Sequence, residues 1–138
     1  MKKIVLIDDH DTFRAGLRQL ISKYTDYEIV GEAADAQQGE ATVRKYTPDL
    51  AVVDLSLPDK SGIQLTRILK SALPDIRIVI VSMHSKIDYI LNALRAGAQG
   101  YLVKESVSGC LGEVLHLPVV DLHHDYRALC QVVDLPDF

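Results

Sequence analysis

Five short apolar runs, separated by longer segments with helical periodicity, constrain the fold of this chain more than any other feature. The runs are KIVLID (3–8), EIVGEA (28–33), LAVVDL (50–55), RIVIVS (77–82) and GYLVK (100–104). Near-continuous apolar runs of this length are typical of strands that are buried on both faces of a parallel sheet. The alternation therefore predicts an α/β domain in which strands are followed by helices.

The segments between the runs carry the helical signals. A first helix has an apolar face from Phe13 to Ile21, and either Asp11 or Thr12 is expected to cap its N-terminus. Further helices are expected at about 36–46, 63–71 and 86–96. The five units predict a doubly wound five-stranded parallel sheet with ligands at the carboxyl ends of the strands. The strand order is expected to be the flavodoxin-like 2-1-3-4-5, in which the first and third strands are neighbours.

Polar side chains stand at those strand ends. Asp8 and Asp9 end the first run and Asp54 ends the third, so neighbouring first and third strands would bring three carboxylates together. Such carboxylates repel one another unless cations intervene. Two cations fit, namely Mg²⁺, which prefers oxygen ligands, and Lys104, which closes the fifth run. Ser82 closes the fourth run, and its hydroxyl can donate a hydrogen bond to a phosphoryl oxygen.

Taken in order, these strand-end residues resemble the receiver domain of two-component response regulators. The resemblance extends to the loop DLSLPDKSG (54–62) and to AGAQGYLVK (96–104), and it covers residues 1 to about 108. The longer pattern SMHSKIDYILNALRAGAQGYLVKES looks most like receivers attached to LuxR-type helix-turn-helix regulators. The ordered set carries the resemblance, because an acidic pair after a strand is weak on its own.

The resemblance implies a phosphorylation-controlled signalling switch. In that family the residue matching Asp54 accepts a phosphoryl group from a histidine kinase. Asp8, Asp9 and Asp54, with the backbone carbonyl of Ser56, would hold the Mg²⁺ cofactor. A conventional enzyme is not expected, but Mg²⁺-dependent autophosphorylation from phosphodonors and autodephosphorylation are.

The resemblance assigns further residues around the phosphoryl group. Ser82 and Lys104 would contact it, and Tyr101 would be the switch aromatic that turns inward on phosphorylation. The residues expected to border the site are Pro58, Met83 and His84.

Other interpretations remain open from the residues alone. Asp8 and Asp9 could cap the first helix, Lys104 could be an ordinary solvated lysine, and Tyr101 could serve packing only. Haloacid-dehalogenase-like phosphatases also use a strand-end aspartate, but their motif has a second aspartate where this chain has Ser56. A phosphate-independent interaction domain is the third alternative.

Composition limits the setting and the partners. The chain of 138 residues carries a net charge of -4 and no block of Lys and Arg, so no nucleic acid contact by this chain itself is expected. No run is long enough to span a membrane, and no signal peptide is expected, because the first residues hold too few apolar side chains for its apolar core. Two cysteines without a disulfide framework indicate a cytoplasmic protein. The expected partners are a sensor histidine kinase and a second copy of the chain.

The C-terminal part departs from the family pattern. A receiver domain is expected over 1–117, with a weak fifth helix at about 106–117 because that segment contains Gly109 and Gly112. Residues 118–138 are expected to form an atypical tail with one short helix, for which Asp121 is a candidate cap. No DNA-binding domain is expected in the chain.

Overall fold

The computed structural model describes residues 2–104, in which strands and helices alternate along the chain. The elements are β1 (Lys3–Ile7), α1 (Asp11–Tyr24), β2 (Glu28–Ala33), α2 (Ala36–Tyr46), β3 (Leu50–Asp54), α3 (Gly62–Ala72), β4 (Arg77–Ser82), α4 (Ile87–Arg95) and β5 (Gly100–Val103). Each range expected from the sequence within these residues matches an observed element to within one residue.

The five strands form one parallel sheet in the order β2-β1-β3-β4-β5, which confirms the predicted doubly wound topology. The strand register brings the carboxyl ends to a common edge, because Ile7 pairs with Val53 and Asp54 pairs with Val81. Residues that follow these positions therefore meet at one edge of the sheet.

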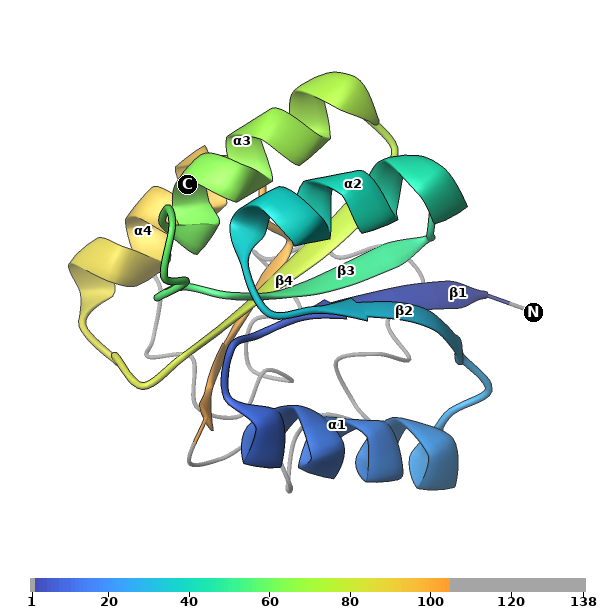
Figure 1. The fold of residues 1–138 in the computed structure, drawn as a ribbon. Coiled ribbons are helices and arrows are strands. Elements are labelled where there is room, and N and C mark those ends of the chain that lie inside the picture. The colour runs from blue at the N-terminus through green and yellow to red at the C-terminus, as the bar shows by residue number, and fades with distance from the viewer. Residues whose placement is uncertain (1, 105–138) are drawn as a thin grey trace.

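The sheet is covered on both faces, as Figure 1 shows, with α1 on one face and α2, α3 and α4 on the other. The central strand β3 is buried along its whole length, which explains its continuous apolar run. Leu17 and Ile21 of α1 pack into the core from one side, and Leu65 and Leu69 of α3 pack from the other. The polar strand ends are thus held in place by a buried apolar core.

The expected N-cap of the first helix is wrong. Asp11 is the first residue of α1, and the capping position is occupied by His10, whose side chain makes no capping hydrogen bond. The reason lies two residues before His10, where the Asp8 carboxylate accepts a hydrogen bond from the His10 backbone N–H at 2.8 Å and sets the chain direction at the start of the helix. By contrast, α3 begins with a complete capping box made by Ser61 and Gln64.

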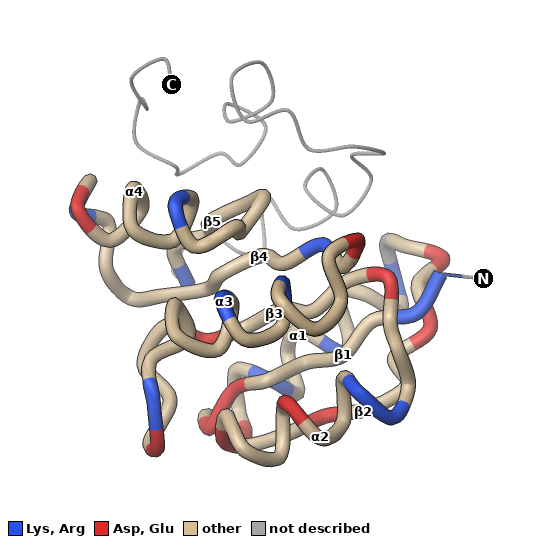
Figure 2. Tube along the Cα trace, turned by 90° about the horizontal axis from the view of Figure 1, so that it is seen from above, with Lys and Arg blue, Asp and Glu red and all other residues tan. Residues whose placement is uncertain are grey.

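Several expectations fall on other parts of the chain. The fifth helix, the tail helix, both cysteines and the division at residue 117 lie outside the described residues. Within residues 2–104, no helix is long and apolar enough to cross a membrane. Along the same residues basic and acidic positions are interspersed (Figure 2).

Candidate functional site

The carboxyl edge of the sheet brings together two buried carboxylates and one lysine. Asp8 and Asp54 are 1% and 2% exposed, and the Lys104 Nζ lies 3.0 Å from Asp8 Oδ2 and 3.3 Å from Asp54 Oδ2. Buried charges are tolerated when they are paired. One ammonium between two carboxylates leaves a net negative charge, so these three groups can attract a further cation.

The environment of Asp54 raises its pKa from 3.8 to about 6. Burial is the largest cause, because it disfavours the charged carboxylate, and the nearby charge of Asp8 acts in the same direction. Lys104 and the backbone N–H of Ser56, which lies 3.2 Å from Asp54 Oδ1, act in the opposite direction. A cation bound at this edge would favour the ionised carboxylate.

Sequence reasoning missed His10 as a member of the cluster. Its Nδ1 lies 3.2 Å from Asp8 Oδ1, 3.3 Å from Asp9 Oδ1 and 3.5 Å from Asp54 Oδ2. Lys104 Nζ lies 3.1 Å from the same nitrogen. The available signal was the position of His10 directly after two strand-end acids.

These donors fit a divalent metal ion. Asp8, Asp9, His10 and Asp54 each offer one ligand atom, and the four atoms lie within 4.8 Å of one another. Among the described residues, the buried Asp8 Oδ2 accepts no hydrogen bond, and its close charged neighbour is Lys104. A buried carboxylate oxygen without a hydrogen bond is costly unless a cation satisfies it, and oxygen donors are the ligands that Mg²⁺ prefers.

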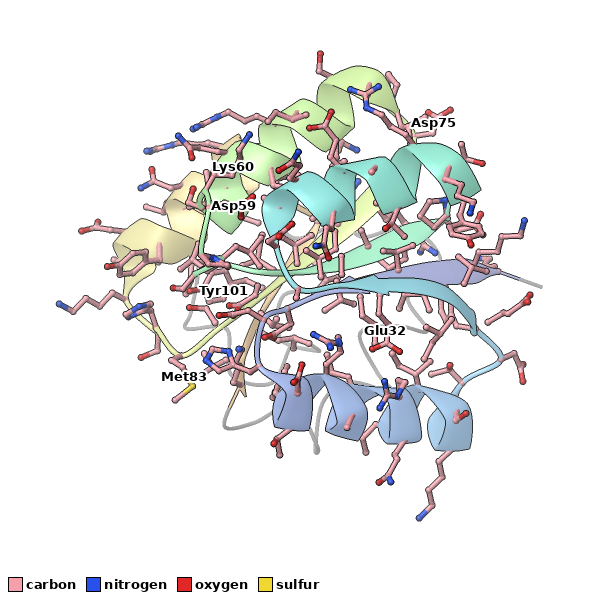
Figure 3. All side chains as sticks on the ribbon, in the orientation of Figure 1. Glu32, Asp59, Lys60, Asp75, Met83 and Tyr101 are labelled. Atoms are coloured by element: carbon pink, nitrogen blue, oxygen red, sulfur yellow. The ribbon has the colours of Figure 1, made fainter. Side chains whose placement is uncertain are left out.

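Arg14 of α1 contacts the backbone of Asp8 in the acidic pair Asp8 and Asp9. Sequence reasoning missed this contact as well. Its guanidinium donates to the backbone carbonyl of Asp8, to Glu32 Oε1 at 2.8 Å and to Asp11 Oδ1 at 2.9 Å. Glu32 lies on β2 and points toward α1 (Figure 3), where it also accepts from Arg18 at 2.9 Å. The network ties the β1–α1 connection to both the helix and the edge strand.

The loop after β3 is held close to Asp54. The backbone N–H of Gly62 donates to the Leu55 carbonyl at 2.7 Å, and Ser56 pairs with Ser61 in an isolated bridge. At the outer side of this loop the Asp59 carboxylate accepts from the first two backbone N–H groups of α2, at 2.8 and 2.9 Å. Both hydrogen bonds lower the pKa of Asp59, and the one from the Ala36 N–H has the larger effect. The loop is thereby fastened to the neighbouring helix.

The loop after β4 connects Ser82 to Tyr101. The Ser82 Oγ accepts from the His84 backbone N–H at 2.9 Å, and the Tyr101 hydroxyl donates to the His84 carbonyl at 2.7 Å. Tyr101 is fully buried, and burial raises the pKa of its hydroxyl. The His84 ring stacks on Tyr89 with 4.5 Å between centroids. The aromatic residue predicted as the switch is therefore buried, with its hydroxyl hydrogen-bonded to the loop after β4.

Two of the residues predicted to border the site, Pro58 and Met83, lie on the surface. Pro58 is exposed, and Met83 is 63% exposed and points away from the domain (Figure 3). Next to Lys104 there is a hollow of about 540 Å³. It is lined by His10, Thr12, Phe13, Met83 and Lys104. The Lys104 ammonium also lies 4.6 Å from the centroid of the Phe13 ring, which helps to hold the lysine in place.

The fold and the strand-end cluster define a class of protein, a doubly wound α/β domain with an acidic pocket at its carboxyl edge. Residues 4–115 match the family described as response regulator receiver domain. The chain belongs to this family of two-component signalling domains, as the resemblance predicted.

Three comparisons show the range of its relatives. The chain is 41% identical over 105 residues to the DNA-binding transcriptional activator DevR/DosR of Mycobacterium tuberculosis, covering 76% of this chain and 48% of that protein. It is 34% identical over 113 residues to the transcriptional regulatory protein DegU of Brevibacillus brevis, covering 82% and 48%. The crystal structure of a LuxR-family two-component response regulator from Aurantimonas sp. shares 36% identity and a TM-score of 0.75, covering 83% of this chain and 85% of that one.

The comparisons correct one prediction. The partner set expected from the sequence excluded nucleic acid, and for this family that exclusion is wrong, because one relative is a DNA-binding activator and the solved structure is a LuxR-family regulator. The chain spans about half the length of the two curated relatives. The negative charge of a receiver domain says nothing about partners that the other half of such a relative contacts.

Proposed function

We propose that this receiver domain accepts a phosphoryl group on Asp54 from the phosphohistidine of a sensor kinase. The observation that carries the proposal is the buried Asp54 carboxylate beside Lys104, at 3.3 Å, at the rim of an acidic pocket. A carboxylate is an established covalent phosphoryl acceptor. No carboxylic acid stands at position 56 for the acid–base role that a phosphatase of the haloacid-dehalogenase type needs.

In the proposed step an oxygen of Asp54 attacks the phosphorus atom. The O–P bond forms as the P–N bond to the kinase imidazole breaks, and the leaving nitrogen keeps the electron pair. Lys104 neutralises negative charge beside the incoming group, and the Ser82 hydroxyl can donate to one of its oxygens. A Mg²⁺ ion held by Asp8, Asp9 and Asp54 would neutralise further charge on the phosphoryl oxygens. Attack of water on the phosphorus later returns the carboxylate and inorganic phosphate.

The proposed output is a change in the loop after β4. A phosphoryl group brings about -1.5 to -2 charges and strong acceptor oxygens to Asp54. Ser82 lies on the adjacent strand, and its Oγ is already bonded to His84. Movement of Ser82 toward the phosphoryl group would therefore move His84, and with it the carbonyl that anchors Tyr101. The exposed segment from Met83 to Tyr89 would present a different surface to a partner.

Intact-protein mass spectrometry after incubation with acetyl phosphate tests the acceptor. We expect one phosphoryl adduct that requires Mg²⁺ and is absent in Asp54→Asn. The matched control is Asp49→Asn, an aspartate at the opposite edge of the sheet whose carboxylate binds the Lys3 backbone N–H. An adduct that persists in Asp54→Asn, or its absence from the wild-type chain, would overturn the proposal.

A further inference from the structure

We propose that His10 adds a nitrogen donor to the acidic pocket and gives it a selective affinity for a divalent first-row transition ion. The inference rests on the proposed function, since it concerns the same metal site. The carboxylates suit Mg²⁺, whereas imidazole is a typical ligand of ions such as Co²⁺, Ni²⁺ and Zn²⁺. A nitrogen at this position therefore changes which ions the pocket prefers.

The geometry places the nitrogen among the acidic oxygens. Nδ1 of His10 lies between 3.2 and 3.5 Å from one oxygen each of Asp8, Asp9 and Asp54. All four donors lie within 4.8 Å of one another. Donors bound to one ion at about 2.0–2.2 Å lie at most about 4.4 Å apart. Movements of a few tenths of an ångström would therefore let all four share one ion.

A second observation points to a cation. Asp8 is 1% exposed, and the Lys104 ammonium lies 3.0 Å from its Oδ2 and 3.3 Å from Asp54 Oδ2. One ammonium thus balances two buried carboxylates, and the remaining negative charge favours a second cation. Lys104 can only donate, so its 3.1 Å contact with Nδ1 of His10 is a hydrogen bond when the ring proton is on the other nitrogen. With the proton on Nδ1 instead, the ring donates to Asp8 Oδ1 at 3.2 Å. An ion bound at Nδ1 would replace whichever of these two contacts is present.

The backbone holds His10 at the pocket without fixing its ring. Its N–H donates to Asp8 Oδ1 at 2.8 Å, a contact that survives any change of the side chain except proline. The side chain is 59% exposed, so it can adjust to a bound ion and can be substituted without disturbing the core. A loss of ion binding after substitution therefore reports on the imidazole itself.

Calorimetric titration with Co²⁺ and with Mg²⁺ tests the assignment on the full chain. We expect His10→Asn to raise the Co²⁺ dissociation constant by about tenfold or more relative to that of Mg²⁺. The visible absorption of bound Co²⁺ should change as a nitrogen ligand is lost. Asp9→Asn is the matched control, because loss of an oxygen donor should weaken the binding of both ions.

The outcomes separate this inference from the proposed function. If His10→Asn weakens the binding of Co²⁺ and Mg²⁺ equally, or leaves Co²⁺ binding unchanged, the inference that His10 donates a nitrogen to the ion is overturned. The phosphoryl adduct of the wild-type chain in Mg²⁺ does not depend on that result. An adduct together with unchanged Co²⁺ binding in His10→Asn overturns the inference alone, whereas His10-dependent Co²⁺ binding without any adduct overturns the proposed function alone.

Discussion

Gly62 lies directly against the backbone of Asp54. A Cβ atom on Gly62 would come within 2.3 Å of the Asp54 carbonyl oxygen and within 3.0 Å of the Leu55 Cα. Both neighbours are backbone atoms of a buried strand end, so neither can rotate away. The close approach lets α3 start beside Asp54 and constrains the loop that follows it.

Substitution of Gly62 by alanine should therefore strain the site. We expect Gly62→Ala to lower the free energy of unfolding by about 1–3 kcal/mol, the usual range for overpacking. Gly16→Ala is the matched control, because Gly16 lies within α1 and an added Cβ meets nothing within 4 Å. That change should raise stability by about 0.5–1 kcal/mol. Urea denaturation measures the free energy of unfolding of both variants. Equal changes in the two variants would contradict the predicted clash at Gly62.

Stability should depend on pH through Asp54. Its pKa is raised to about 6 in the folded protein against 3.8 as the ordinary value. Between these values the folded state binds more protons than the unfolded state, so this group makes stability fall as pH rises from about 4 to about 6. Asp54→Asn removes the effect and should be more stable than the wild type at pH 8, by about 1–3 kcal/mol. Denaturation from pH 4 to 8 in the absence of metal checks this, and parallel pH profiles would refute it.

The fold could be predicted because its signals are local. Strand β3 is apolar on both faces, and residues such as Ser61 and Gly97 mark helix ends through their own chemistry. The N-cap of α1 could not be predicted in this way. Asp11 is a good capping residue by type, but His10 occupies the N-cap position, because the Asp8 side chain just after β1 accepts a hydrogen bond from the His10 backbone N–H.

The site was predictable only in part, for a related reason. Asp8, Asp54 and Lys104 follow from strand order, since the ends of parallel strands meet at one edge. The contacts of His10 and Arg14 depend on the direction of side chains that leave a loop and a helix. Sequence spacing does not specify those directions, so both contacts had to come from the structure.

Lys104 should couple energetically to Asp54. Lys104→Met leaves Asp8 and Asp54 buried without their cation, so we expect a loss of about 3–5 kcal/mol at pH 7. Asp54→Asn should stabilise the Lys104→Met variant more than it stabilises the wild type, since it removes one of the unpaired charges. A double-mutant cycle measured by denaturation without metal gives the coupling energy. Additive effects of the two changes would show that the ion pair contributes nothing.

Tyr101→Phe should loosen the loop after β4 while preserving the core. The change removes only the hydroxyl that donates to the His84 carbonyl at 2.7 Å, at an expected cost of about 0.5–1.5 kcal/mol. Amide exchange of residues 83–86 should become faster. Tyr89→Phe is the control, because it keeps the ring that stacks on His84. Unchanged exchange in Tyr101→Phe would mean that the hydroxyl does not anchor the loop.

Arg14 should position the acidic pair for metal binding. Its guanidinium holds the Asp8 carbonyl as well as Glu32, and a lysine cannot reproduce this fork of donors. We expect both Arg14→Ala and Arg14→Lys to weaken Mg²⁺ binding by about tenfold, as is usual when groups behind metal ligands are lost. Glu32→Gln separates positioning from stability, because it weakens the pairing with Arg14 and Arg18 but leaves the donation to Asp8 possible. Calorimetry should then show near-normal Mg²⁺ affinity for Glu32→Gln, and an equal loss in all three variants would assign Arg14 a purely structural role.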